Sequence, residues 1–426
     1  MKNTMIFAFV VFLCGCNSEK NKAITSPLDY DQYLNTYVSW SKESALSEID
    51  FWQSRFEDDS TKIVELGKLA GLYTTLFSAT GDARKLYRSE KLLKKAIEVS
   101  AREKDTYFRS LAHNYISQHR FKEAKVLLDS AYAFPDNKRE TELMLFDVSM
   151  ELGDYRAADS LLGKLKNNSD YNYLIRLSKW SDYKGNLDAA IRYMEQAKSI
   201  AESRGIKTLK VWTYTNIADY YGHAGRIKDA YNHYLKALEL QPDNAYAKKG
   251  IAWIAYAWEG NTLEANRILD SVMKGHKAPD YFLLKAEMAE FDEDSSEEKK
   301  LRESFVNLVE TGDYGNMYRT YLIELYAEIN PKRALELAAV EVGNRTTPET
   351  YQLLAYAQLK MGNKEEALRI IEDHVVDKTF EPMALYYGAL VFKANDLNVR
   401  VNELKKELKT ASFELGPVIM RRIDML

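Results

Sequence analysis

The feature that most constrains this chain is a pattern of small and apolar residues that returns at a nearly constant interval. The successive intervals are 34, 32, 40 and 35 residues along Ala124, Ala158, Ala190, Ala230 and Ala265. A repeat of this length is one supersecondary unit that buries its apolar face only against its neighbours, so it predicts a stacked array. The 426 residues include few glycines (19) and prolines (8), which argues against a turn-rich all-β fold.

One copy of the repeat carries every anchor position. It reads Tyr214-x2-Ile217-Ala218-x2-Tyr221, then Gly225, then Ala230-x3-Tyr234-x2-Ala237-x4-Pro242. Small residues suit the places where two antiparallel helices approach, and larger apolar residues fill the space between them. Gly225 permits the turn, and Pro242 ends the second helix. This copy resembles a tetratricopeptide repeat (TPR).

The resemblance implies an all-α, right-handed superhelical solenoid. We expect nine or ten TPR-like helical hairpins over residues 61–409, since the same pattern recurs throughout that range. Stacked arrays need covered ends. Residues 41–60, which include Leu46, Ile49 and Trp52, are predicted to form an N-terminal capping helix, and residues 410–426 a C-terminal capping segment.

The N-terminus carries a targeting pattern. Lys2 precedes an apolar stretch from Met5 to Leu13, and Cys14-Gly15-Cys16 follows. This stretch resembles the lipobox of bacterial lipoproteins, which implies that residues 1–15 are a signal peptide and that Cys16 is the acylated first residue of the mature chain. Residues 16–40 are then expected to be the lipidated cysteine and a polar tether.

The composition excludes several kinds of site. The formal net charge of −4 provides no broad basic field for nucleic acid. Both cysteines, Cys14 and Cys16, precede the folded region, so cysteine-ligated metals, disulfides and cysteine nucleophiles are not expected there. The six histidines are scattered without His-x-x-x-His spacing, and the sequence contains no phosphate-binding or nucleophile-elbow motif. We therefore predict no catalytic residues, no metal and no cofactor.

An acidic stretch from Asp292 to Glu303 has spacing similar to an EF-hand calcium loop. However, Glu297 stands where that loop needs glycine. We predict a solvated acidic turn in which Ser295 or Ser296 caps the next helix.

The first helix of each hairpin in such a solenoid lines the concave surface, and residues beside the buried anchors point into it. The predicted groove residues combine both charges with aromatic rings. They are Arg109, Arg176, Tyr183, Trp212, Asn216, Asp219, Arg319 and Tyr356.

Trp212 and Asn216 form the most specific of these predictions. They lie one turn apart on one helix, so an exposed indole beside an amide could anchor a peptide. The alternative is that Trp212 folds back onto Ile200 and Ala201 as ordinary packing.

These features favour a non-catalytic scaffold, lipid-anchored in a bacterial cell envelope at the outer membrane, that binds a protein or peptide in its concave groove. Which side of the membrane it occupies stays open. The alternative is a nutrient- or glycan-binding outer-membrane lipoprotein, although repeat intervals of 32 to 40 residues leave little room for the insertions that shape such pockets.

Overall fold

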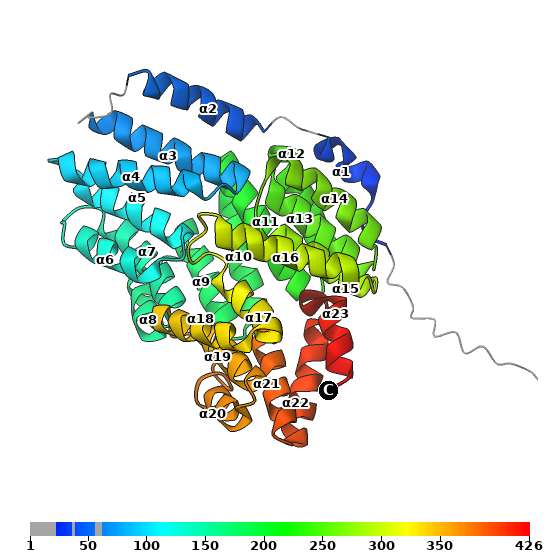
Figure 1. Cartoon of the computed structure of the whole chain (residues 1–426). Coiled ribbons are helices and arrows are strands. Elements are labelled where there is room, and N and C mark those ends of the chain that lie inside the picture. Colours follow the sequence, from blue (N-terminus) through cyan, green and yellow to red (C-terminus); the bar gives the residue numbers. More distant parts are fainter. Residues whose placement is uncertain (1–22, 36–38, 56–61) are drawn as a thin grey trace, which may run out of the picture.

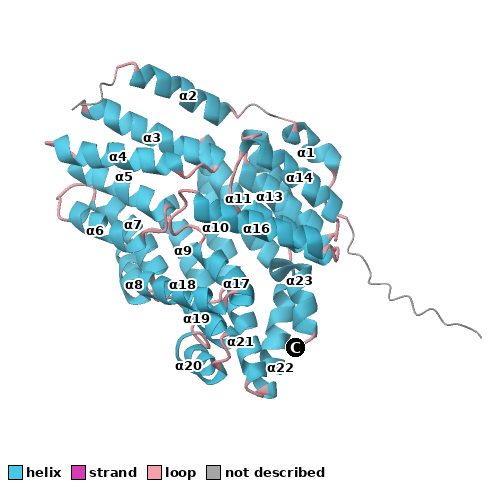
Figure 2. Ribbon diagram, viewed as in Figure 1, coloured by secondary structure: helices cyan, strands magenta, loops and turns pink. Residues whose placement is uncertain are grey.

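The computed structural model describes residues 23–35, 39–55 and 62–426. Its regular structure in these ranges is entirely helical (Figure 2). The predicted signal peptide, Cys16 and the first part of the predicted tether lie outside the described residues.

Ten antiparallel helix pairs follow one another from α3 to α22 in the described part of the chain (Figure 1). The first five pairs are α3 (Ile63–Thr80) with α4 (Arg84–Val99), α5 (Lys104–Ser117) with α6 (Phe121–Tyr132), α7 (Lys138–Leu152) with α8 (Tyr155–Lys164), α9 (Tyr171–Tyr183) with α10 (Leu187–Arg204), and α11 (Lys207–His223) with α12 (Ile227–Leu240). The other five are α13 (Ala245–Trp253) with α14 (Thr262–Gly275), α15 (Asp280–Phe291) with α16 (Ser295–Thr311), α17 (Arg319–Ile329) with α18 (Pro331–Asn344), α19 (Pro348–Lys360) with α20 (Lys364–His374), and α21 (Pro382–Ala394) with α22 (Asn398–Leu408). A π-helical stretch, η1 (Ile254–Trp258), continues α13. The predicted all-α solenoid is confirmed.

The best-matched hairpin shows why the repeat positions need their residue types. Ala218 of α11 and Ala230 of α12 are 0% and 1% exposed, and Ile217 is fully buried between the two helices. Gly225 turns the chain between them with a φ of +70°, a conformation that costs glycine little. The repeat anchors are therefore the packing core of the hairpin.

The first helices of successive hairpins lie on the inner side of the curve. Contacts join α5 to α7, α17 to α19 and α19 to α21, in addition to those within each hairpin. Successive first helices therefore contact one another, as expected on the concave side, where the path along the solenoid is shorter than on the convex side. The inner face is consequently built from odd-numbered helices.

The solenoid also meets itself along one edge. The Lys277 amide, in the connection between α14 and α15, donates a hydrogen bond of 2.7 Å to the Thr80 carbonyl at the end of α3. Further along, the Thr346 amide donates to the Leu152 carbonyl at 3.4 Å. A Cβ on Gly153 would lie 2.4 Å from the Thr346 oxygen, so this approach requires glycine. We call this line of contacts the seam.

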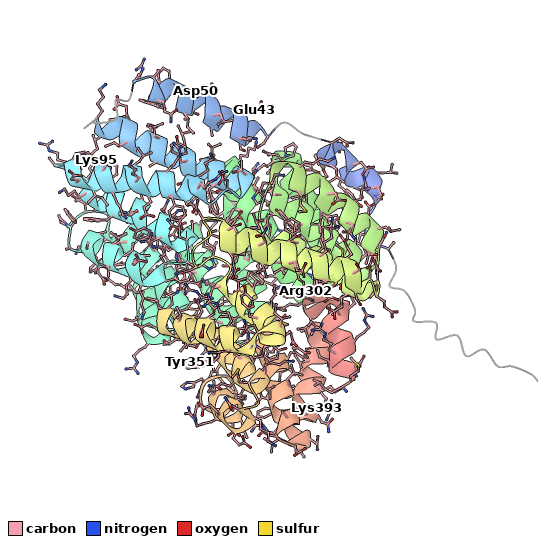
Figure 3. All side chains as sticks on the ribbon, viewed as in Figure 1. Glu43, Asp50, Lys95, Arg302, Tyr351 and Lys393 are labelled. Carbon is pink, nitrogen blue, oxygen red and sulfur yellow. The ribbon has the colours of Figure 1, made fainter. Side chains whose placement is uncertain are left out.

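Residues ahead of the first hairpin form two helices. α2 (Trp40–Gln53) lies against α3 through Ala45 and Ile49, in the place predicted for the N-terminal cap. Its exposed residues Glu43 and Asp50 lie on the opposite side of the helix (Figure 3).

The assignment of residues 16–40 to a polar tether is wrong for residues 24–34. α1 (Pro27–Leu34) packs on α12 and α14, and Tyr30 and Leu34 are 1% and 5% exposed. These two residues are four positions apart, so they share one face of a helix that begins at Pro27. This short apolar face was not predicted, because the residues that precede it are mostly polar.

The C-terminal segment differs in part from the predicted cap. A short 3₁₀ turn, η2 (Lys409–Ala411), leads into α23 (Ser412–Asp424), which is interrupted at Gly416 with a φ of +75°. α23 contacts α21 and α22, and it also crosses to α11, η1 and α15 (Figure 1). It therefore lies on the inner face of the middle of the solenoid as well as at its end.

Candidate functional site: the inner face of the solenoid

Two of the arginines predicted to line the groove are held by the solenoid itself. The Arg109 guanidinium forms an ion pair of 2.9 Å with Asp105, one turn earlier on α5. Arg176 of α9 donates to the Leu143 carbonyl at 2.9 Å and pairs with Asp147 of α7 at 2.5 Å. Arg109 also donates to the Thr141 hydroxyl of α7 at 3.2 Å, so both arginines join inner helices, are largely buried and have their charges neutralised.

The predicted residues in the second half of the chain are engaged in the same way. Arg319 pairs with Glu341 at 3.0 Å. The Tyr356 hydroxyl donates to Glu328, and its ring lies against Tyr387 at a centroid distance of 4.3 Å. Tyr356 is 6% exposed. It belongs to the core rather than to an open groove surface.

Asp219 is likewise a structural acceptor. Its carboxylate receives hydrogen bonds from the Tyr234 hydroxyl at 2.5 Å and the Tyr246 hydroxyl at 2.6 Å. Burial raises the pKa of Asp219, and the two hydroxyl donors oppose that rise. The expectation that Asp219 faces an open groove is corrected, because two long tyrosines from the next helices reach over it.

Trp212 and Asn216 are the predicted residues that remain at an open surface on the inner side. Trp212 is 42% exposed, and its ring meets Tyr171 edge-on at a centroid distance of 6.4 Å. The Asn216 amide donates to the Trp212 carbonyl at 2.8 Å. The alternative in which Trp212 folds back as core packing is not what the structure shows.

A hollow of about 480 Å³ lies at this point, and we call it the Trp212 hollow. Hydroxyl and amide side chains surround the indole ring. The lining residues are Thr208, Val211, Trp212, Thr215, Asn216, Gln241, Asn244 and Tyr246. The repeat pattern did not predict Tyr246, which is 55% exposed at the start of α13, because it lies outside the first helix of the best-matched repeat.

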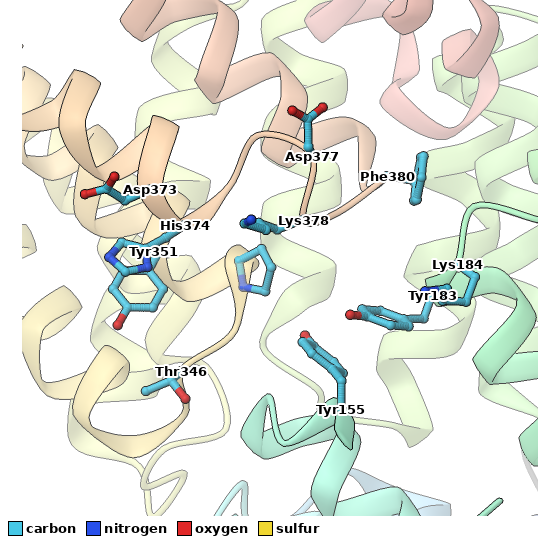
Figure 4. Close-up of a pocket in the computed structure, with 11 residues that line it drawn as sticks. Tyr155, Tyr183, Lys184, Thr346, Tyr351, Asp373, His374, Asp377, Lys378 and Phe380 are labelled. Atoms are coloured by element: carbon cyan, nitrogen blue, oxygen red, sulfur yellow. The ribbon is translucent and has the colours of Figure 1, made fainter. Parts of the chain in front are cut away.

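A second cavity, of about 310 Å³, lies at the seam, and we call it the seam pocket (Figure 4). Tyr155 and Tyr183 stack on one side at 4.1 Å between centroids, and Tyr351 stacks on His374 at 3.8 Å on the other. Phe380 closes the pocket beside Gly185, where a Cβ would lie 2.7 Å from its ring. Of these residues only Tyr183 was predicted, because the walls come from segments almost 200 positions apart.

α23 occupies part of the inner face. The Trp253 indole donates to the Phe413 carbonyl at 3.1 Å, and the Phe413 ring packs so closely on α11 that a Cβ on Gly222 would lie 2.7 Å from it. Glu290 of α15 accepts from Arg422 of α23 and from Arg302 of α16, the latter at 3.0 Å. The C-terminal helix therefore fills the inner face between α11 and α15.

A half-buried carboxyl lies against this helix, where a Cβ on Gly416 would be 2.8 Å from Glu287 Oε1. Glu287 of α15 accepts a hydrogen bond of 3.0 Å from the Tyr256 hydroxyl. Burial raises the pKa of Glu287 to about 7, in spite of that hydrogen bond. The group therefore titrates at a higher pH than an exposed glutamate does.

The acidic stretch is a helix cap. The Asp294 side chain accepts from the Glu297 amide at 3.0 Å and caps α16. The prediction that Ser295 or Ser296 would cap this helix is wrong by one residue, since the helix already begins at Ser295. Within residues 23–35, 39–55 and 62–426, no cluster of three or more His, Cys, Asp or Glu side chains is arranged to hold a metal ion.

Comparison with known proteins identifies the repeat. Residues 213–244 match the tetratricopeptide repeat family model, so the chain is a TPR-containing protein. This match lies over α11 and α12, the hairpin with the complete anchor set.

The chain is similar to several solved structures. Human IFIT1, solved as a dimer with PPP-AAAA, is 13% identical over 90% of this chain and 94% of that chain, with a TM-score of 0.43. Yeast Tom70 is 13% identical over 93% of this chain and 94% of that chain, with a TM-score of 0.40. PilF of Pseudomonas aeruginosa is 15% identical over 50% and 96%, with a TM-score of 0.37.

No curated protein sequence matches the chain. None of the helices in the described ranges is both long and apolar enough to cross a bilayer.

Proposed function

We propose that this chain is a non-catalytic, membrane-anchored TPR scaffold that binds a protein or peptide partner at the Trp212 hollow. TPR solenoids serve as interaction surfaces through their inner helices. The observation that carries the proposal is the contrast on that face. Trp212 keeps 42% of its surface exposed, while Arg109, Arg176 and Asp219 are engaged within the fold.

The hollow has the chemistry of a peptide site. An exposed indole offers a large apolar area that loses little conformational freedom on binding, which is why tryptophan is frequent among residues that dominate interface energy. The amides of Asn216, Gln241 and Asn244 make local hydrogen bonds, but each keeps at least one further N–H that can pair with the polar backbone of an extended segment. The partner is therefore a chain that brings an apolar side chain flanked by accessible backbone.

The test is a double variant, Trp212→Ala with Asn216→Ala, compared with wild type in pull-downs from the native envelope. We expect loss of a specific partner, identified by mass spectrometry, with unchanged melting temperature and helicity. Substituting an exposed side chain usually alters the free energy of unfolding by less than about 0.5 kcal/mol, whereas a core tryptophan costs about 3 to 5 kcal/mol.

The matched control is Val126→Ala, a 65% exposed residue on α6, which is a second helix and so faces away from the inner side. It should retain the partner. Capture of that partner by the double variant with wild-type affinity would remove the Trp212 hollow from the binding site.

The anchor part of the proposal rests on the sequence around Cys16 and has its own test. Cys16→Ala should release the chain from membranes during a high-salt wash, because salt screens charges but does not extract buried acyl chains. A variant that still pellets with washed membranes would contradict acylation at Cys16.

The glycan-binding alternative has one structural observation in its favour. The seam pocket offers stacked aromatic rings beside Asp373, Asp377 and Lys378, a combination of flat apolar surface and hydrogen-bonding groups that suits a sugar ring. Phe380, which is 57% exposed, is the residue to test. If the pocket takes sugars, Phe380→Ala should abolish glycan binding measured by calorimetry and leave partner capture at the Trp212 hollow intact.

A further inference from the structure

The segment that leads from the predicted anchor is clamped to one place on the solenoid. The backbone amides of Ile24 and Thr25 both donate to one oxygen of the Glu259 carboxylate, each at 2.7 Å. The Thr25 hydroxyl donates to the other oxygen at 2.9 Å. Three donors on one carboxylate, two of them from the backbone, form a charge-assisted attachment at the end of η1.

α1 extends this attachment over the outer face. The Tyr30 hydroxyl donates to Glu264 of α14 at 2.6 Å, and the Tyr231 hydroxyl of α12 donates to Asp29 at 2.9 Å. Arg267 of α14 pairs with Asp31 at 2.5 Å. Since α12 and α14 are second helices, α1 leaves the inner face and the Trp212 hollow uncovered.

Chain length then limits where an anchor at residue 16 can be. Eight residues separate Cys16 from Ile24. A chain spans at most ~3.3 to 3.6 Å per residue, so a lipid on Cys16 lies within about 28 Å of the Glu259 clamp. We call the part of the molecule that holds Glu259 and the first turns of α1 and α14 the clamped end. In Figure 1 this end is on the opposite side of the molecule from α6 and α8. An anchored chain therefore keeps the end of the molecule that holds Glu259 within about 28 Å of the anchoring residue.

The same end carries two isolated, outward-facing leucines. Leu28 in the first turn of α1 is 91% exposed, and Leu263 in the first turn of α14 is 84% exposed. Among the large apolar side chains in the described ranges these two have the highest exposed fractions. Both leucines belong to this end, because Leu263 follows Glu259 by four positions and Leu28 lies two positions before Tyr30, which donates to Glu264.

We propose that the clamped end, meaning the first turns of α1 and α14 together with Glu259, is the membrane-facing surface of this protein, and that Leu28 and Leu263 enter the lipid at the headgroup boundary. The occupant is a lipid bilayer. The inference rests on the proposed anchor at Cys16. The carboxylates of this end are already bonded to Tyr30, Arg267 and the backbone, so its contact with lipid is apolar and does not depend on anionic headgroups.

The orientation can be read with a single fluorophore. The mature chain has no cysteine after Cys16, so Leu263→Cys and, as control, Val126→Cys each introduce one label site. The full lipidated protein is placed in phosphatidylcholine vesicles that contain a spin-labelled lipid, and each variant carries an environment-sensitive dye. The protein without an added cysteine controls for labelling at residue 16.

We expect the dye at position 263 to shift to the blue and to be quenched several-fold more than the dye at position 126, which lies on α6. Glu259→Ala should reduce that difference, because the clamp no longer fixes the orientation, while the protein still floats with the vesicles. Equal quenching at both positions in floating protein would overturn the orientation and leave the anchor standing. Failure to float would overturn the anchor and with it this inference.

Discussion

At the scale of single residues, the side chains of the inner face that are available to a ligand are those not already hydrogen-bonded or ion-paired within the fold. Asp219 illustrates this, because its position on the helix is that of a groove residue, yet it accepts hydrogen bonds from Tyr234 and Tyr246. Helical spacing fixes the direction of a side chain but not the reach of its neighbours. A tyrosine from the following hairpin can convert a predicted contact residue into a structural one.

Asp219→Ala is therefore expected to destabilise the fold. Tyr234 is 6% exposed, so losing its acceptor leaves a buried hydroxyl unpaired, at a cost of about 1 to 3 kcal/mol. Asp219→Asn keeps an acceptor oxygen and should lose clearly less. Urea unfolding of the three proteins provides the measurement, and equal midpoints for Asp219→Ala and wild type would show that the hydroxyl finds water instead.

Glu287 gives a pH dependence of defined sign. Its pKa is raised to about 7 by burial, so between its ordinary value near 4.5 and about 7 the folded state holds more protons than the unfolded state. The free energy of unfolding therefore falls as the pH rises through that window, because it decreases with pH wherever the folded state binds more protons than the unfolded state.

Glu287→Gln should remove this contribution, which is at most about 3 kcal/mol, because the pKa rises from 4.5 to about 7 and each pKa unit corresponds to about 1.4 kcal/mol. In urea unfolding, the free energy of unfolding of the variant should rise relative to that of wild type as the pH increases from 5 to 7.5. An identical pH slope in both proteins would show that Glu287 is ionised throughout that window.

At the scale of elements, two short helices depart from the repeat and do more than close the ends. α1 packs on second helices at the outer face, and α23 packs on first helices at the inner face. An aromatic residue anchors each of them: the Tyr30 hydroxyl donates to Glu264, and the Phe413 carbonyl accepts from the Trp253 indole. The sequence assigned α1 to a tether from its composition and α23 to a cap from its position. Neither property indicates which surface of the solenoid a terminal helix packs on.

Ending the chain after Lys409 tests the role of α23. The truncated protein should keep its helical hairpins, since their cores are local, but it should melt at a lower temperature and bind more of a hydrophobic dye. Removal of α23 uncovers Trp253 and the apolar surface that Leu415 and Val418 cover. Phe413→Ala should reproduce part of the loss, and an unchanged melting temperature in both would show that α23 adds no stability.

At the scale of the whole molecule, the seam makes this solenoid more than a chain of nearest neighbours. Repeat arrays gain stability from each hairpin and its adjacent interface. Here the connections around Lys277 and Thr346 also contact turns near Thr80 and Leu152, some 200 positions away. The seam therefore couples the two halves of the array and builds the seam pocket.

Two glycine variants isolate the seam. Gly153 and Gly205 both have left-handed φ values, +78° and +67°, so alanine at either position brings a similar backbone cost of about 1 to 2 kcal/mol. Only at Gly153 does the new Cβ meet a backbone atom, the Thr346 oxygen, because nothing lies within 4 Å of the Cβ at Gly205.

Gly153→Ala should therefore unfold at a lower urea concentration than Gly205→Ala and increase the radius of gyration measured by X-ray scattering. Equal effects of the two substitutions would indicate that the seam contributes nothing to stability.

The sequence by itself determined the repeated element. The spacing predicted close helix contacts at Ala218 and Ala230 and a left-handed turn at Gly225. The structure shows both alanines buried and Gly225 with a positive φ. The number of hairpins and the all-α class followed, since both depend on contacts within about 40 residues. Trp212 was also foreseeable, because its exposure depends on its own helix and the next.

The tertiary structure decided everything that depends on where distant segments meet. The seam pocket joins Tyr155 to Tyr351, α23 reaches Trp253 from 160 residues away, and Glu259 holds Thr25 across 234. Such contacts arise from the summed rotation of many hairpins, and a small change in each would separate the same residues. A repeat pattern specifies each step of the superhelix, but only the accumulated curve brings its edges and ends together.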